Sequence, residues 1–164
     1  MMSITHLFLF GALVKYIMGV GNYSMFDDSI GIKVVEEITA KNLDQGFSAI
    51  DLSGNLLNIF SYLNEGTEKI IIVDSGEFEI TPGEFIWFTP DLVVSTKELT
   101  NITSHEGDII KVLKLAMETG YHLPPIQIMG IQPECIKSEF GLSKTLESNL
   151  ARYLQVVISK ILED

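Results

Sequence analysis

The chain has 164 residues, of which 46% are hydrophobic and 20% are charged, a composition typical of one globular domain. Its formal net charge of -11 repels the phosphates of nucleic acids and anionic lipids, so we expect no nucleic-acid partner. The single cysteine, Cys135, can form neither an internal disulfide nor a cysteine-based zinc cluster. Nothing in the composition therefore requires an oxidising compartment, and we expect a cytoplasmic protein.

An apolar segment, residues 1–13, precedes the first expected strand. It resembles the apolar part of a signal peptide, but no basic residue precedes it and no small-residue cleavage site follows it. Lys15 interrupts the apolar run well short of the roughly 20 residues that a membrane-spanning helix needs. We therefore expect no membrane insertion, and we interpret residues 1–13 as an appendage to a single domain, residues 14–164. Our hypothesis is that native translation starts at Val14.

From residue 14 onward, short apolar runs alternate with amphipathic stretches, a pattern typical of strands connected by helices. In chain order it predicts a strand at 14–20, a helix at 29–40, a strand at 47–52, a short helix at 54–62, strands at 69–74 and 84–89, a helix at 107–119, a strand at 125–131 and a helix at 144–162. Within 84–89, aromatic and apolar residues alternate, which indicates a strand at the edge of the sheet or antiparallel to its neighbours. A loop at 90–103 leads to a helix N-cap at Ser104. The predicted fold class is α/β, a three-layer sandwich in which helices cover both faces of a mostly parallel twisted sheet.

Polar residues at the carboxyl ends of the expected strands are the candidates for a functional site, because ligands bind in this crevice of open α/β sheets. Asp27 and Asp28 follow the first strand across a glycine-rich turn. Asp51 ends the second strand and Asp74 ends the third, while His105 is expected in the loop before a helix. Two or three carboxylates with one imidazole suit a divalent transition metal such as nickel or zinc.

Each candidate also has a structural interpretation. Asp27 or Asp28 can place a negative charge at the start of the following helix, where the helix dipole favours it. Asp74 is harder to explain in this way, because an acid at the end of an apolar strand is partly desolvated unless something pairs with it. His105 could be a solvated loop histidine. Cys135 fits a buried small apolar residue better than a nucleophile.

The turn Gly19–Ser24 raises a second hypothesis, a dinucleotide-binding domain, because it lies between a strand and a helix and Asp51 ends the next strand. The match is incomplete, since Ser24 replaces the third glycine of that motif. Asp27 and Asp28 would also repel a pyrophosphate at the helix N-terminus. Nucleotide binding is therefore disfavoured.

Several sequence blocks, read together, resemble the hydrogenase maturation endopeptidases over nearly the whole chain from Lys15. The first block, residues 19–31 (GVGNYSMFDDSIG), is similar to the family's opening pattern G-x-G-N-x-x-x-x-D-D/E-x-x-G. The other blocks are residues 51–54 (DLSG), where the family usually has D-G-G-T or D-G-G-S, residues 70–74 (IIIVD), 82–84 (PGE), 103–105 (TSH) and 130–134 (GIQPE). In order and spacing, this combination is specific.

The resemblance implies that Asp28, Asp74 and His105 form a nickel-recognising triad that is also catalytic. Many members have glutamate at the position of Asp28, so the aspartate changes the reach of the arm and not the donor type. Nickel would arrive with the substrate, and other divalent ions could occupy the site in vitro. The ion could polarise the scissile carbonyl or activate a water, with Asp28 or Asp74 as the base.

The resemblance also implies substrate contacts by Asp51, Gly54 and Asn22. Asp51 corresponds to the acid that discriminates between substrates in this family. Leu52 and Ser53 replace two glycines of its usual turn. Because a non-glycine residue resists a positive φ, we expect the backbone of this turn to differ from the family's.

The expected function is that of a monomeric endopeptidase that removes the C-terminal extension from the nickel-loaded large-subunit precursor of a nickel–iron hydrogenase. Two alternatives remain open, a hydrogenase assembly chaperone that no longer cleaves and the nucleotide-binding domain. The intact set of Asp28, Asp74 and His105 favours the peptidase over the chaperone.

Overall fold

The computed structural model describes residues 11–91 and 105–164, and of residues 105–107 it describes the backbone alone. Residues 1–10 of the appendage, most of the expected loop and the N-cap at Ser104 lie outside the described residues. The expected strands and helices are present in the expected order. Within the described part of the chain, no helix is both long and apolar enough to cross a membrane.

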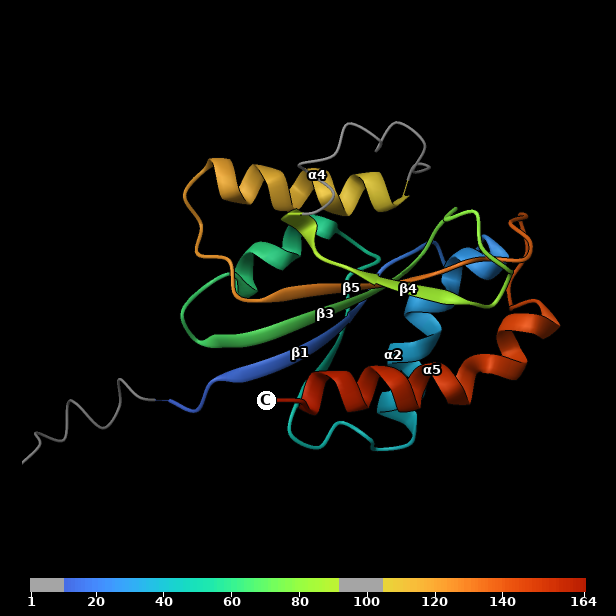
Figure 1. Cartoon of the computed structure of the whole chain (residues 1–164), viewed down its shortest axis with the longest axis horizontal. Helices are drawn as coiled ribbons and strands as arrows, with labels where there is room; N and C mark the ends of the chain where they lie inside the picture. Colours follow the sequence, from blue (N-terminus) through green and yellow to red (C-terminus); the bar gives the residue numbers. More distant parts are fainter. Residues whose placement is uncertain (1–10, 92–104) are drawn as a thin grey trace, which may run out of the picture.

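A five-stranded sheet forms the centre of the domain, with the strand order β2-β1-β3-β5-β4. The strands are β1 (Val14–Gly19), β2 (Ser48–Asp51), β3 (Thr67–Ser75), β4 (Phe85–Phe88) and β5 (Ile126–Ile131). All pairings are parallel except that of β4, which runs antiparallel to β5 at the edge, as the alternating sequence predicts. In Figure 1 the parallel strands run from left to right, so their carboxyl ends gather on the right.

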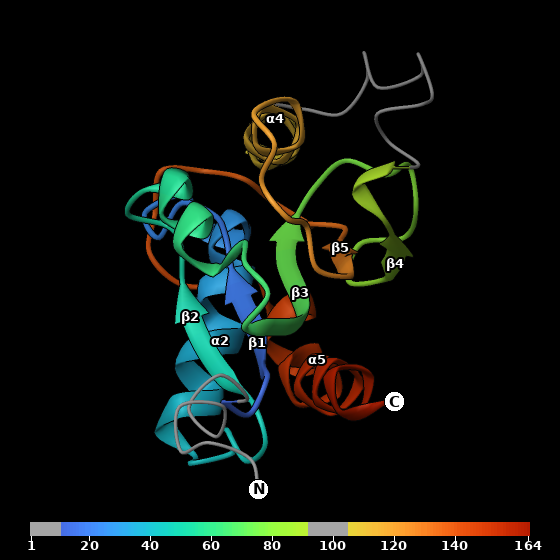
Figure 2. The same ribbon diagram turned by 90° about the vertical axis from the view of Figure 1, so that its left-hand side faces the viewer.

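Helical segments cover both faces of the sheet (Figure 2). They are η1 (Phe26–Ser29), α2 (Ile30–Ala40), η2 (Leu56–Tyr62), α4 (His105–Glu118) and α5 (Lys144–Leu162). Alternate residues of β3 face opposite layers, because Ile71 packs with α2 and α5 whereas Ile72 packs with η2 and α4. Burial on both faces explains why the centre of β3 is apolar throughout. The predicted three-layer α/β sandwich is confirmed.

Local geometry differs from the expectation near the candidate site. Asp27 and Asp28 lie inside a 3-10 turn, η1, that precedes α2, and the short helix expected at 54–62 is also of the 3-10 type, η2. The expectation that His105 lies in a loop is wrong, since α4 begins at His105. From the sequence the helix is expected to start at Gly107, because glycine is a poor helix former. In the structure Gly107 lies within the first turn of α4.

Candidate active site

Glycines of the first motif bring the start of α2 against the ends of β1 and β3. A Cβ atom on Gly31 would overlap the backbone carbonyl oxygens of Val73 and Val20. Gly21 has a φ of +144°, in the region that favours glycine, and a Cβ there would overlap the carbonyl oxygen of Asp28. This close packing places Asp28 beside the carboxyl end of β3.

Asp27 is fully buried and holds the scaffold around the site together. Its Oδ2 accepts hydrogen bonds from the backbone N–H groups of Glu134 at 2.9 Å and Cys135 at 3.0 Å. Its Oδ1 accepts a third from the N–H of Ser143 at 2.7 Å, just before α5. Asp27 therefore ties the segment after β5 to η1 instead of capping α2. Cys135 takes part through its backbone, and its side chain is half-buried, not buried as expected.

Asp28 and Asp74 form a pair of buried acids at the carboxyl end of β3, with exposed fractions of 4% and 0%. Asp28 Oδ1 accepts a hydrogen bond from Ser75 Oγ at 2.6 Å, and its Oδ2 accepts one from the backbone N–H of Asn22 at 3.1 Å. Asp74 Oδ1 accepts one from the backbone N–H of Ser75 at 2.8 Å. The fold thus brings two residues of the predicted triad to one place.

The second carboxylate oxygen of Asp74, Oδ2, is buried and has no hydrogen-bond partner among the described residues. Burial raises the pKa of this carboxyl well above its usual range, and the nearby charges of Asp28 and Asp108 raise it further. An ionised carboxyl in such a position needs a cation to compensate its charge. The acid pair is therefore suited to a positively charged ligand and disfavours a phosphate.

The first turn of α4 lies on the same side of the domain as the acid pair. In Figure 1, α4 begins on the right, above the carboxyl ends of the strands. His105 is its first residue, and Asp108, one turn further along, is close enough to raise the pKa of Asp74. The imidazole of His105 lies outside the described side chains, so its membership of the triad stays a prediction.

The residues expected to contact substrate lie on two neighbouring turns at this sheet edge. Asp51 is exposed at the end of β2, and its Oδ1 accepts a hydrogen bond from the N–H of Ser53 at 2.8 Å. Asn22 and Ser53 both line a surface hollow of about 410 Å³ between the turns. Gly54 is exposed, with open space where a side chain would extend. Asn22, which lines this hollow, also donates its N–H to Asp28, so the concave surface adjoins the acid pair on the Asp28 side.

The turn after Asp51 does not need the glycines that the resemblance leads one to expect. Neither Leu52 nor Ser53 has a positive φ. Among the described non-glycine residues, only Phe26, Asn42 and Glu79 do. Leu52 is 1% exposed and packs into the core, while its N–H donates to the carbonyl of Gly19 at 2.9 Å. The side chain at 52 thus anchors the turn, and the backbone at 52 and 53 stays outside the positive-φ region, as non-glycine residues require.

Sequence reasoning missed two residues that organise the site. Ser75 hydrogen bonds with both acids, although a single serine after Asp74 carries little signal in the sequence. Gln132 is buried, accepts a hydrogen bond from the N–H of Phe78 at 2.7 Å, and donates one to Glu77 at 2.9 Å. Its place inside the block 130–134 could have drawn attention to it. It fixes the loop that leaves β3 just beyond the acids.

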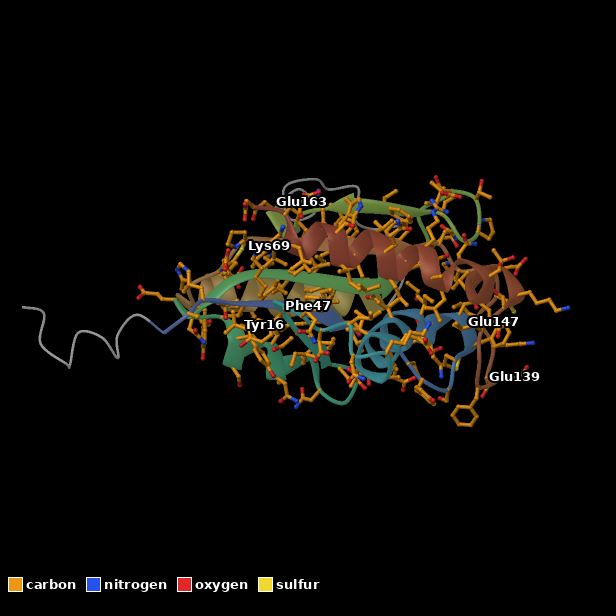
Figure 3. All side chains as sticks on the ribbon, turned by 90° about the horizontal axis from the view of Figure 1, so that it is seen from below. Tyr16, Phe47, Lys69, Glu139, Glu147 and Glu163 are labelled. Atoms are coloured by element: carbon orange, nitrogen blue, oxygen red, sulfur yellow. The ribbon has the colours of Figure 1, made fainter. Side chains whose placement is uncertain are left out.

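A larger hollow, of about 770 Å³, lies at the opposite end of the sheet, where Lys69, Pro124 and Glu163 contribute to its lining. Figure 3 shows Lys69 and Glu163 at one end of the domain and Glu139 and Glu147 at the other. None of the described residues singled out from the sequence as site residues lines this hollow. The size of a cavity therefore does not locate the site in this protein.

Comparison with known proteins identifies the class to which this arrangement belongs. Residues 32–160 match the family model for hydrogenase maturation proteases. The chain belongs to this family. Among its relatives, the hydrogenase 2 maturation protease of Escherichia coli is 23% identical over 155 residues, covering 90% of each chain. A putative hydrogenase maturation protease of Methanocaldococcus jannaschii is 25% identical over 153 residues, 88% of this chain and 94% of the relative.

Solved structures agree on the fold. The hydrogenase maturating endopeptidase HybD of Escherichia coli has a TM-score of 0.73 at 20% identity, covering 90% of this chain and 91% of that one. Membership of the hydrogenase maturation proteases makes this chain a hydrolase of peptide bonds. The match to the family model confirms the family inferred from the sequence blocks. Asp74 and His105 lie within the matched range, whereas Asp28 lies just ahead of it.

Proposed function

We propose that this peptidase removes the C-terminal extension from the nickel-loaded large-subunit precursor of a nickel–iron hydrogenase, and that Asp28, Asp74 and His105 bind the nickel ion carried by that substrate. The observation that carries the proposal is the buried Oδ2 of Asp74, which has no partner among the described residues and lies in a pair of acids. A divalent ion would supply the positively charged partner that a buried carboxylate oxygen needs.

The donor set fits nickel chemically. Carboxylate oxygens from Asp28 and Asp74, with an imidazole from the start of α4, form a mixed oxygen and nitrogen site of the kind that divalent transition metals accept. Asp74 comes from β3 and Asp28 from η1, so the two oxygens approach the ion from different elements. A precursor without nickel would leave Oδ2 of Asp74 without a partner, which would make the metal a condition for productive binding.

Each acid has a distinct part in the proposed reaction. Both oxygens of Asp28 already accept hydrogen bonds, from Ser75 and Asn22, so this carboxylate is held in place before the substrate arrives. Asp74 has a raised pKa and must release its proton when nickel binds. The substrate's ion would then polarise the scissile carbonyl or activate a water, and one of the two acids would accept the proton.

The hollow beside the acid pair is the proposed path of the substrate peptide. Asn22 and Ser53 line it, and the exposed Asp51 lies next to Ser53. Asp51 and Gly54 would contact the precursor from the turn after β2. We also propose that the enzyme acts as a monomer. We further propose a cytoplasmic location, because its single cysteine needs no oxidising compartment.

The decisive experiment incubates the protein with a large-subunit precursor, loaded with nickel or left empty, and follows the mass of the precursor. We expect loss of the C-terminal extension only from the loaded form. His105→Ala should abolish this loss, whereas His122→Ala, which changes an exposed histidine beyond the other end of α4, should not. Binding without cleavage would favour the chaperone alternative. A protein that neither binds nor cleaves would return the nucleotide-binding hypothesis to consideration.

A further inference from the structure

Ser75 is the last residue of β3 and is 3% exposed. It donates two hydrogen bonds, and both acceptors are acids of the candidate site. Its backbone N–H donates to Asp74 Oδ1 at 2.8 Å, and its hydroxyl donates to Asp28 Oδ1 at 2.6 Å. One buried residue therefore contacts the two carboxylates that come from separate parts of the chain.

The hydroxyl of Ser75 sets the orientation of Asp28. The other oxygen of Asp28 accepts from the backbone N–H of Asn22, but that N–H is shared, since it lies 3.1 Å from Asp28 Oδ2 and 3.3 Å from the backbone carbonyl oxygen of Asp28. Asn22 is also exposed on a surface turn. The bond from Ser75 is shorter, buried and directed from the rigid central strand, so it is the stronger constraint on the carboxylate.

The same residue directs Asp74. Because the N–H of Ser75 engages Oδ1, the carboxyl of Asp74 is fixed with its other oxygen, Oδ2, buried and unpaired among the described atoms. The backbone donor would persist in any residue other than proline at position 75. The hydroxyl is specific to serine and threonine, and it is the part whose role can be tested.

We propose that Ser75 is a positioning residue for nickel, whose hydroxyl holds the carboxylate of Asp28 so that Asp28 and Asp74 Oδ2 meet one ion. This inference rests on the proposed function of the acid pair. Partners that orient metal ligands in this way contribute about 10–100-fold to metal affinity. A purely structural hydroxyl would contribute to folding stability and leave the affinity unchanged.

The test measures binding of Ni²⁺ alone to the full chain by isothermal titration calorimetry, with thermal melting to verify that each variant folds. Ser75→Ala should bind nickel about 10–100-fold more weakly than the wild type. Ser75→Thr, which keeps a hydroxyl, should recover most of the affinity. Ser75→Cys, which matches serine closely in size but is a weak donor, should resemble Ser75→Ala even if threonine proves too large to fit.

Thr67→Val is the matched control. Thr67 is a buried residue at the other end of β3, and its hydroxyl donates to the backbone carbonyl of Tyr62. This variant should lose thermal stability but keep the wild-type nickel affinity. Equal nickel affinity in wild type and folded Ser75→Ala or Ser75→Cys would overturn the role of Ser75 while leaving the acid pair in place. A wild-type protein without nickel affinity would overturn the proposed function and this inference together.

Discussion

Replacing Asp74 by asparagine should stabilise the metal-free protein at neutral pH while removing its nickel affinity. The carboxyl is fully buried, Oδ2 has no partner among the described residues, and burial and Asp28 raise its pKa. Each pH unit by which burial raises the pKa of a carboxyl corresponds to about 1.4 kcal/mol. Asparagine keeps an oxygen for the N–H of Ser75 and cannot ionise, although its amide nitrogen takes the place of Oδ2 as a buried polar atom. We therefore expect Asp74→Asn to increase the free energy of unfolding by more than about 1 kcal/mol at pH 7.

The gain should depend on pH in a definite direction. Because the pKa of Asp74 is higher in the folded protein than in the unfolded chain, the folded protein holds this proton more tightly. Stability is therefore lost as the pH rises from the ordinary aspartate pKa of about 4 toward the raised value, by about 1.4 kcal/mol for each pH unit in that window. Below that window the wild-type carboxyl is protonated in both states, and the gain from Asp74→Asn should disappear.

Urea unfolding of the metal-free proteins at pH 7 and at about pH 4 measures both effects. Asp44→Asn is the matched control, because Asp44 is exposed at the surface and its replacement should change stability little. The reasoning would be refuted by an Asp74→Asn protein that is less stable than the wild type at pH 7. An equal gain at both pH values would refute it as well.

Nickel titration at pH 7 in buffers of different ionisation enthalpy should reveal net proton release, because nickel binding lowers the raised pKa of Asp74, and identical heats in every buffer would contradict the raised pKa. Gly31→Ala should lower the free energy of unfolding by about 3 kcal/mol or more, whereas Gly54→Ala, with open space around its Cα, should stay within about 0.5 kcal/mol of wild type in urea unfolding. Similar losses in both variants would contradict the steric argument. Leu52→Gly should cost about 2–5 kcal/mol because it deletes a buried leucine side chain, and a higher melting temperature would mean that the turn is strained by leucine.

The fold was predictable wherever apolar periodicity and burial agree. Residues 70–73 are apolar because β3 is covered on both faces, and the apolar stripe over 144–162 matches the observed bounds of α5. Boundaries at helix starts were less predictable, since α4 begins two residues before Gly107, a poor helix former. The 3-10 geometry of η1 and η2 likewise depends on tertiary contacts and not on local pattern.

The acids of the site were predictable by position, but their partners were not. Asp74 was singled out because a strand end places it in the crevice, and its burial agrees with that argument. Ser75 and Asp28 are 47 residues apart, and Asp27 bonds to backbone groups more than a hundred residues away. Every residue except proline carries a backbone N–H donor, so no sequence pattern can reveal which of them Asp27 accepts hydrogen bonds from.

Asp27 and Asp28 are identical neighbours, yet they differ in how readily each can be exchanged. Asp27 fits three backbone N–H groups from a rigid scaffold, and the longer arm of a glutamate would displace all of its acceptor contacts at once. Asp28 meets a hydroxyl and a loop N–H, and the resemblance places glutamate at this position in many relatives. In the proposed function one aspartate is constrained by folding and the other by nickel binding, so adjacent positions of a single turn should accept different substitutions over evolution.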